Sequence, residues 1–310
     1  MMFLGMLIKS IITFLCVALS VGFYTLMERK VLGYMQLRKG PNKVGIMGLP
    51  QPLADAAKLF TKEAVSISSS NKNVYLLSPM GAVVVMLILW SLYTSSWNIS
   101  NIKLGVLFFL CVSSLNVYLI LLSGWSSNSK YALLGAIRAV AQTISYEVSM
   151  ALVLLTAILL SLSFDFNSQQ NSSTPIWLAV VIMPVLIMWF VSALAETNRA
   201  PFDLAEGESE LVSGFNIEYG GGEFALLFIA EYGSILLMSI LTGALFMGGL
   251  MESSGILTVL EFSSFAFMFL WSRATFPRMR YDTLMSLTWK SFLTVILGFI
   301  LMLLCVNSVL

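Results

Sequence analysis

Residues 133–162, LLGAIRAVAQTISYEVSMALVLLTAILLSL, indicate the class of fold most clearly. This stretch runs for 30 residues and contains only two charged side chains, Arg138 and Glu147. Because an α-helix rises about 1.5 Å per residue, roughly 20 residues cross the hydrocarbon core of a bilayer. The stretch is therefore expected to form a membrane-spanning helix with Glu147 inside it.

Seven other apolar segments suit the same interpretation. They are Phe3–Met27, Val74–Tyr93, Leu104–Leu122, Ile176–Leu194, Phe224–Met251, Ile256–Trp271 and Phe292–Leu310. Over the whole chain 58% of the residues are hydrophobic and 11% are charged, whereas an average soluble domain has about 25% charged residues. We therefore expect an all-α integral membrane protein with about eight transmembrane helices, forming a single membrane domain over residues 1–310.

The lysines and arginines predict the orientation of these helices. Eight of the 17 lie in the loop after the first segment: Arg29, Lys30, Arg38, Lys39, Lys43, Lys58, Lys62 and Lys72. Seven more lie at later odd-numbered loops: Lys130, Arg138, Arg199, Arg273, Arg278, Arg280 and Lys290. Only Lys9 and Lys103 remain for the other side. Since basic residues stay on the cytoplasmic or matrix side, both termini are expected on the opposite side, and the long loops 28–73 and 195–220 on the inner side.

The first inner loop contains a candidate interfacial helix. Apolar side chains recur there at helical spacing: Leu53, Ala56, Ala57 and Phe60. Pro50 and Pro52 suit a helix start, and a dozen residues give about 18 Å of helix, too short to span. We expect a short amphipathic helix lying in the membrane interface, either as a surface anchor or as a lid over a site.

The composition excludes several cofactors. The chain has no histidine, and its three cysteines, Cys16, Cys111 and Cys305, stand alone in apolar segments. Iron–sulfur clusters, haem and zinc therefore lack a plausible set of ligands. No basic tract suggests a nucleic-acid partner. If the protein takes part in redox chemistry, we expect the redox centres to belong to other chains.

Most of the titratable chemistry lies in an acidic run. Residues 195–211, AETNRAPFDLAEGESEL, contain five acids and one arginine, and Glu218, Glu223 and Glu231 follow. A solvated loop is the simplest interpretation, but Glu147 and Glu231 lie inside apolar segments. A charge near the bilayer centre costs at least about 2.5 kcal/mol, so such acids are kept when they pair, take a proton or line a hydrated cavity. Proton transfer is the functional alternative.

Several motifs are distinctive: MERKVLG at 27–33, RKGPNKVG at 38–45, residues 51–63, RAVAQTISYE at 138–147, AETNR at 195–199, PFDLAEGESEL at 201–211 and FPRMRYD at 276–282. Together these motifs resemble a known family, subunit 1 of NADH:ubiquinone oxidoreductase (respiratory complex I), most of all its mitochondrially encoded animal form. They cover nearly the whole chain in order. Glu223 is a departure, because a small residue or proline is common at that position.

The resemblance implies a core membrane subunit of a proton-pumping enzyme, one that builds much of the chamber entered by ubiquinone. The residues expected at the quinone cavity are Glu28, Arg29, Asp55, Phe60, Arg199, Asp203, Phe215 and Arg278. Those expected to couple quinone reduction to proton translocation are Arg138, Tyr146, Glu147, Glu196, Glu206, Glu208, Glu210, Glu218 and Glu231. No residue is expected to bind a metal or to act as a catalytic group.

The resemblance also implies partners and a location. The chain would bind no cofactor; ubiquinone would be the substrate, and NADH, FMN and iron–sulfur clusters would be held by partner subunits. Those partners are the quinone-site and iron–sulfur subunits of the peripheral arm, small and antiporter-like membrane subunits, and membrane lipids. We expect a multi-pass protein of the mitochondrial inner membrane with both termini toward the intermembrane space. Three alternatives remain: a cation- or proton-coupled transporter, a structural anchor, and the membrane subunit of a hydrogenase complex.

Overall fold

The computed structural model describes residues 2–63, 67–93, 102–173, 178–205, 207, 214–248 and 255–309. Within these residues every regular element is helical. The longer helices are α1 (Met2–Met35), α3 (Lys72–Leu89), α4 (Gly105–Ser126), α5 (Lys130–Ser161), α8 (Met183–Glu196), α10 (Gly221–Thr242), α11 (Gly255–Thr275) and α13 (Leu293–Val309). The shorter ones are α2 (Gln51–Thr61), α6 (Phe166–Ser173), α7 (Leu178–Val181), α12 (Tyr281–Ser286) and the turns η1 (Trp90–Leu92), η2 (Gly214–Asn216), η3 (Gly243–Met247) and η4 (Leu287–Phe292).

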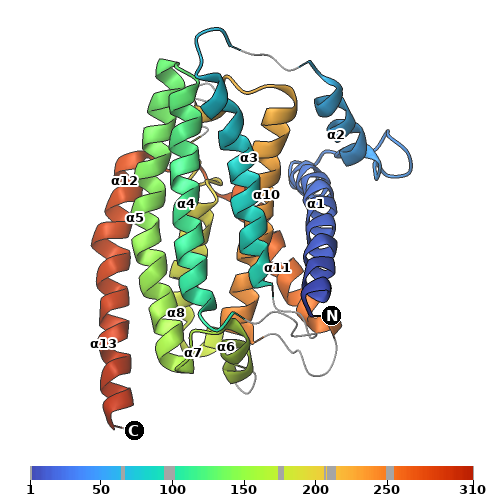
Figure 1. Cartoon of the computed structure of the whole chain (residues 1–310). Helices are drawn as coiled ribbons and strands as arrows, with labels where there is room; N and C mark the ends of the chain where they lie inside the picture. Colours follow the sequence, from blue (N-terminus) through green and yellow to red (C-terminus); the bar gives the residue numbers. More distant parts are fainter. Residues whose placement is uncertain are drawn as a thin grey trace.

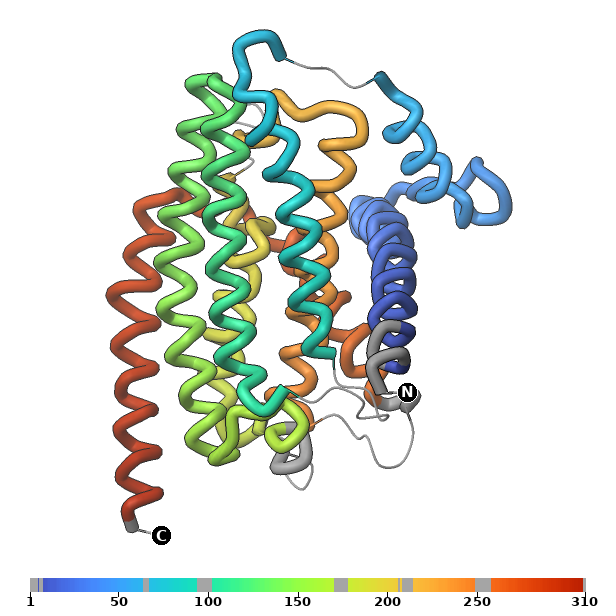
Figure 2. The backbone as a smooth tube through the Cα atoms, in the orientation of Figure 1, coloured from blue at the N-terminus to red at the C-terminus, as the bar shows by residue number. Residues whose placement is uncertain are grey.

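The long helices form a bundle of roughly parallel and antiparallel rods (Figure 1). Helices α3, α4 and α5 lie side by side, α10 packs against α3, and α8 and α13 pack against α5. Helix α1 stands at the edge and contacts α10, α11 and α2. Both chain ends lie at the end of the bundle away from α2 (Figure 2). We call the other end, which carries α2, the α2 end.

The expected membrane helices are confirmed as a class. Six described segments are long and apolar enough to span: Ile8–Met35, Lys72–Leu92, Gly105–Ser126, Lys130–Ser161, Gly221–Met247 and Tyr281–Ser308. The shorter apolar helix α8 and the 21-residue α11 stand where the sequence predicts the fifth and seventh spans. The chain is therefore an all-α membrane protein.

Several boundaries differ from those expected. Helix α1 continues to Met35, so the first residues of the predicted loop 28–73 belong to a helix. The predicted span 176–194 is broken at Ile182, because Pro184 in the first turn of α8 has no N–H to continue α7. The last span begins at Tyr281, eleven residues before the predicted Phe292, and passes through the π-helical turn η4.

Small residues allow the closest helix contacts. A Cβ added to Gly124 of α4 would overlap the Cβ of Ala136 on α5. A Cβ added to Gly135 of α5 would lie 2.8 Å from the backbone of Gly214 in η2. Such contacts are typical of membrane helices, where lipid provides no hydrophobic force to bring helices together and close packing must do so.

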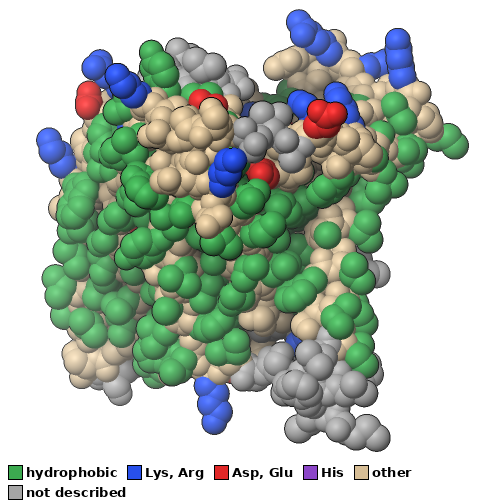
Figure 3. Space-filling view, turned by 45° about the horizontal axis from the view of Figure 1, so that its top comes forward, with side chains coloured by type: hydrophobic (Ala, Val, Ile, Leu, Met, Phe, Trp, Pro, Cys, Tyr) green, Lys and Arg blue, Asp and Glu red, His purple; other side chains and the backbone are tan. Residues whose placement is uncertain are grey.

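The outer surface suits lipid. Large apolar side chains are exposed along the bundle, among them Leu15, Leu19, Leu134, Ile187 and Leu301. Figure 3 shows a broad hydrophobic belt, with most of the visible lysine and arginine side chains at the α2 end of the bundle. The helix α2 forms as predicted, and Leu53 and Phe60 are exposed on it.

Candidate functional site

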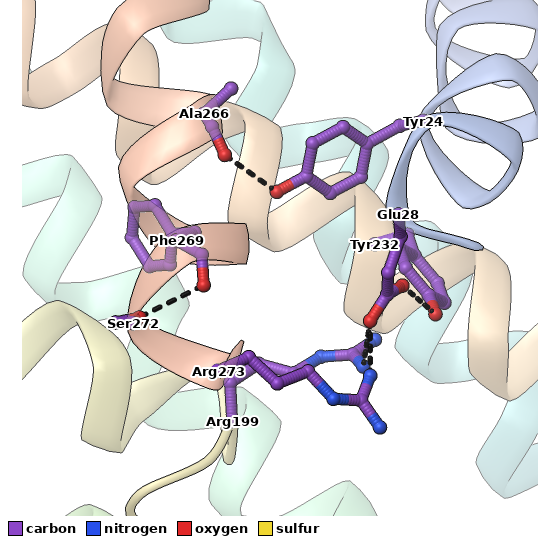
Figure 4. A network of polar contacts seen from close by, with 8 residues as sticks. All are labelled: Tyr24, Glu28, Arg199, Tyr232, Ala266, Phe269, Ser272 and Arg273. Atoms are coloured by element: carbon purple, nitrogen blue, oxygen red, sulfur yellow. Dashed lines mark hydrogen bonds and ion pairs between the residues drawn. The ribbon is translucent and has the colours of Figure 1, made fainter. Parts of the chain in front are cut away.

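A buried ionic cluster lies between α1, α10, α11 and the loop after α8 (Figure 4). Its centre is Glu28 of α1, which is only 4% exposed. The Arg273 guanidinium donates to Oε1 of Glu28, and the Tyr232 hydroxyl donates to Oε2. Nη1 of Arg199 lies 3.7 Å from the same Oε1, and its guanidinium lies 4.2 Å from the centre of the Tyr232 ring. One carboxylate therefore joins four separate segments.

The end of α8 directs Arg199 into this cluster. Helix α8 stops in a Schellman motif: Asn198 adopts a left-handed conformation with φ 50°, and two hydrogen bonds close the turn. The Arg199 N–H donates to the Leu194 carbonyl at 3.2 Å, and the Asn198 N–H donates to the Ala195 carbonyl at 3.2 Å. Asparagine tolerates this conformation better than most residues, so the AETNR motif specifies the turn that follows the helix.

A buried glutamine holds the loop after this turn. Nε2 of Gln142 on α5 donates to the carbonyls of Ala195 at 2.9 Å and Phe202 at 2.7 Å. The backbone N–H of Met279 donates to the Pro201 carbonyl at 3.0 Å, which connects the loop to the segment before α12. The position of Arg199 is thus determined by α5, α8 and the α11–α12 connection together.

An apolar groove leads away from the cluster between α1, η1, α10 and α11. Its volume is about 640 Å³. Tyr24 lines the groove and also packs beside Glu28 and Tyr232. The lining hydroxyls of Thr13, Ser20, Ser239 and Ser263 all donate to carbonyls of their own helices. The groove therefore offers a nearly hydrocarbon surface to whatever fills it.

A smaller cavity lies on another face of α10. It measures about 50 Å³ and is lined by Glu196 and Glu231, together with Asn116, Asn198, Ser123 and Phe215. One carboxylate oxygen of Glu196 and the side-chain oxygen of Asn198 are buried without a hydrogen-bond partner. The volume exceeds the roughly 15 Å³ that one water needs, so the cavity has the size and polarity to hold water. Glu147 on α5 interacts electrostatically with Glu196.

The remaining expected residues lie in other places. Arg29 pairs with Asp55 of α2 at 2.6 Å, and Gln51 donates to the same carboxylate at 2.9 Å, near the surface. Phe60 is 60% exposed. Phe215 lines the small cavity and not the Glu28 cluster. Four further expected residues are half-buried: Arg138, Asp203, Glu218 and Arg278.

Four of the residues expected to couple quinone reduction to proton translocation remain to be placed: Tyr146 and the acids of the 206–210 run. Tyr146 is fully buried, packs beside Phe202 with ring centres 5.8 Å apart and the planes tilted by 54°, and donates to the Leu284 carbonyl at 3.4 Å. Its hydroxyl thus contacts the start of the last span rather than Glu147. The predicted coupling acids Glu206, Glu208 and Glu210 lie outside the described residues.

Sequence reasoning missed three members of the ionic cluster: Tyr24, Tyr232 and Arg273. Arg273 was counted only as a basic loop residue, yet it is the last-turn arginine of α11. A signal was present, since Arg273 closes an apolar helix and Tyr232 directly follows the intramembrane Glu231. Nothing in the order of residues showed that both meet Glu28.

Comparison with known proteins now identifies the family. A family model described as NADH dehydrogenase matches residues 8–304. NADH-ubiquinone oxidoreductase chain 1 of Heterololigo bleekeri is 52% identical over 306 residues, 97% of each chain. The proteins of that name from Aedes aegypti and Salmo salar are 52% and 54% identical, covering 95% and 92% of this chain and 93% and 90% of theirs. The chain belongs to the NADH-ubiquinone oxidoreductase chain 1 family.

Membership confirms the resemblance drawn from the motifs. As a member of the chain 1 family with long apolar helices, the protein is a core subunit of NADH:ubiquinone oxidoreductase and a multi-pass protein of the mitochondrial inner membrane. No group of metal-ligating side chains occurs among the residues described by the structure.

The ionic cluster leads to a stability prediction. Glu28→Gln leaves two guanidinium groups without their carboxylate, and breaking a buried pair costs about 3–5 kcal/mol. We expect the loss of stability in Glu28→Gln to lie at the low end of this range, because Arg273 is 37% exposed. The matched control is Asp55→Asn, whose partner Arg29 is 55% exposed, so that about 1 kcal/mol or less is expected. The inactivation temperature of the assembled complex measures the loss of stability in both variants. Equal shifts of this temperature would show that the Glu28 cluster contributes little to stability.

Proposed function

We propose that this chain guides ubiquinone from the bilayer to a charged reaction chamber and couples quinone reduction to proton translocation. The observation that carries the proposal is the apolar groove, which reaches the Glu28 cluster at Tyr24. Groove and cluster together match a molecule with a long hydrocarbon tail and a polar head. NADH, FMN and the iron–sulfur clusters of partner subunits would supply the electrons.

The groove suits the isoprenoid tail. Its volume of about 640 Å³ lies within the range of about 300–1,000 Å³ typical of small-molecule pockets. Because the lining hydroxyls already donate to backbone carbonyls, a hydrocarbon chain displaces no polar contact. The tail would be held by apolar burial alone, at about 25 cal/mol per Å².

The cluster suits the head group. Quinone oxygens accept hydrogen bonds, and guanidinium and phenol groups donate them. Arg273 is partly exposed and so could reach a ligand without losing Glu28. In this proposal Arg29, Asp55, Phe60, Asp203 and Arg278 belong to the wider chamber. The loops 28–73 and 195–220 would form its walls with the peripheral-arm subunits, and small and antiporter-like membrane subunits and lipids would surround the spans.

The same two segments build the cluster and the acidic cavity, which provides a route for coupling. Tyr232 contacts Glu28 while its neighbour Glu231 lines the cavity. Arg199 pairs with Glu28 while Glu196, three residues earlier, lines the cavity. A charge that develops on quinone beside Arg199 and Tyr232 would change the field at both acids. Glu147 and Glu218, with the acids of the 206–210 run, would extend this relay, and Arg138 and Tyr146 would set its field and hydrogen bonding.

The proposed orientation places the α2 end toward the matrix and both termini toward the intermembrane space. The motivating observation is the excess of lysine and arginine in the odd-numbered loops. We expect protease added to inside-out vesicles to cut the 28–73 loop. Cutting of that loop in intact, sealed membranes, from the intermembrane-space side, would contradict the orientation.

The groove leads to a substrate prediction. Ser263→Phe should narrow the groove and raise the KM for long-tailed ubiquinone more than for a short, soluble analogue. Its matched control is Ser264→Phe on the same helix, since the neighbouring residue points about 100° away and is outside the set that lines the groove. Electron transfer from NADH to artificial acceptors checks that the complex of each variant has assembled. Equal KM changes for both quinones would exclude the groove as the tail site.

The cavity leads to a coupling prediction. Glu147→Gln and Glu231→Gln keep side-chain volume and remove a group that can exchange protons. We expect complexes that still pass electrons to artificial acceptors, with quinone reduction and proton pumping both strongly reduced. Glu147→Asp, which keeps the carboxyl but withdraws it by one methylene, should fall between. Normal proton pumping per electron in both Gln variants would show that Glu147 and Glu231 have a structural role and take no part in proton transfer.

A further inference from the structure

One buried side chain of α5, that of Gln142, closes the loop that connects the ionic cluster to the acidic cavity. An amide nitrogen has two hydrogens, and each has an acceptor here: Nε2 donates to the Ala195 carbonyl at 2.9 Å and to the Phe202 carbonyl at 2.7 Å. These carbonyls are seven residues apart in the chain. Glu196, which lines the cavity, and Arg199, which belongs to the cluster, lie between them. The amide therefore holds both ends of the segment that carries both residues.

The two carbonyls determine which way the amide of Gln142 points. If its oxygen and nitrogen exchanged places, Oε1 would face two carbonyl oxygens, acceptor against acceptor. In the observed orientation Oε1 is buried and has no hydrogen-bond partner among the residues that the structure describes. A buried acceptor without a partner lowers stability. Gln142 thus satisfies the loop and leaves its own acceptor unsatisfied, an arrangement that stabilises one position of the loop.

The same face of α5 contacts the loop again one turn further on. Residues four apart share a helix face, and the ring of Tyr146 packs beside the ring of Phe202 with centres 5.8 Å apart. From the other side, the Met279 N–H donates to the Pro201 carbonyl at 3.0 Å. The end of the loop at residues 201–202 is therefore attached both to α5 and to the segment before α12. Gln142 connects this anchored end to the last turn of α8.

We propose that Gln142 is a positioning residue for quinone reduction and for its coupling to proton translocation. By bonding both ends of residues 195–202, it holds Arg199 at the Glu28 cluster while Glu196 stays at the acidic cavity. Gln142 itself lines neither the groove nor the cavity, so it acts through the loop. The inference rests on the proposed function and adds a residue outside the sets that the family resemblance implies.

A second buried glutamine provides a matched control. Gln169 of α6 is 2% exposed, and its Nε2 donates to the Ser163 carbonyl at 2.9 Å. Like Gln142, it ties a buried amide to a carbonyl outside a helix. Helix α6 lies at the end of the bundle away from α2 (Figure 1), and Gln169 is outside the residues that line the cavity and surround Glu28. Its replacement removes a similar hydrogen bond without changing the 195–202 loop.

The test compares Gln142→Met with Gln169→Met in the assembled complex. Methionine is unbranched, of similar length, and has no hydrogen to donate. We expect Gln142→Met to lower kcat for ubiquinone reduction by up to about 100-fold, because a displacement of about 1 Å can slow a reaction that much. Protons pumped per electron should fall as well, since Glu196 leaves its place at the cavity. KM should change less than kcat, because the residues that line the groove are untouched. Gln169→Met should keep the wild-type kcat and pumping.

Gln142→Glu tests the number of hydrogens directly. A carboxylic acid has one hydrogen to donate and a carboxylate has none, so this variant bonds one carbonyl when protonated and repels both when ionised. We expect its kcat for ubiquinone reduction to lie below that of the wild type. The difference from the wild type at the same pH should widen as the pH rises and the carboxyl ionises. Electron transfer from NADH to artificial acceptors checks that each variant has assembled.

Wild-type kcat and pumping in Gln142→Met would overturn the inference. Equal losses in Gln169→Met would also contradict it, because lowered stability would then explain both. Where Gln142→Met does not assemble, Gln142→Glu decides, and wild-type kcat at every pH would refute a positioning role. Failure of the proposed function is distinguishable, since it would appear in Ser263→Phe and Glu231→Gln whatever the result at Gln142.

Discussion

The buried carboxylate of Glu28 is the interaction on which the arrangement around the site depends. A charge removed from water costs several kcal/mol unless it is paired and hydrogen-bonded, and Glu28 is 4% exposed. Its partners Arg273, Tyr232 and Arg199 come from α11, α10 and the loop after α8. Helix α1 stands at the edge of the bundle. The need to satisfy one carboxylate therefore fixes the position of α1 against the rest and, with it, one wall of the apolar groove.

The membrane explains why the rest of the bundle is held differently. Lipid tails are as apolar as leucine, so exposed side chains such as Leu15 and Leu301 gain nothing by burial. Close backbone approach at Gly124 and buried hydrogen bonds such as those of Gln142 hold the helices instead. Hydroxyls that line the groove donate to backbone carbonyls of their own helices. Because these polar groups are satisfied locally, the interior keeps only a few polar clusters, such as the one around Glu28.

Sequence reasoning recovered the elements better than the site. Apolar runs of about 20 residues are enough to predict membrane helices, and the helical spacing of Leu53 to Phe60 predicted α2. The end of α1 was missed, because the charged residues Glu28, Arg29 and Lys30 resemble a loop, although the helix continues to Met35. The break at Ile182 followed from Pro184, which an averaged apolar pattern hides. Glu28 and Arg199 were expected at one site, but their meeting with Arg273 depends on contacts 245 residues apart in the chain.

Helix α10 shows why local sequence could not reveal how the sites relate. Successive residues on a helix point about 100° apart, so Glu231 faces the acidic cavity while Tyr232 contacts Glu28. A single rigid rod thus presents two neighbouring residues to two polar environments. Because a packed helix moves as a unit rather than residue by residue, a change in charge at the Glu28 cluster that shifts or rotates α10 would also be felt at the acidic cavity.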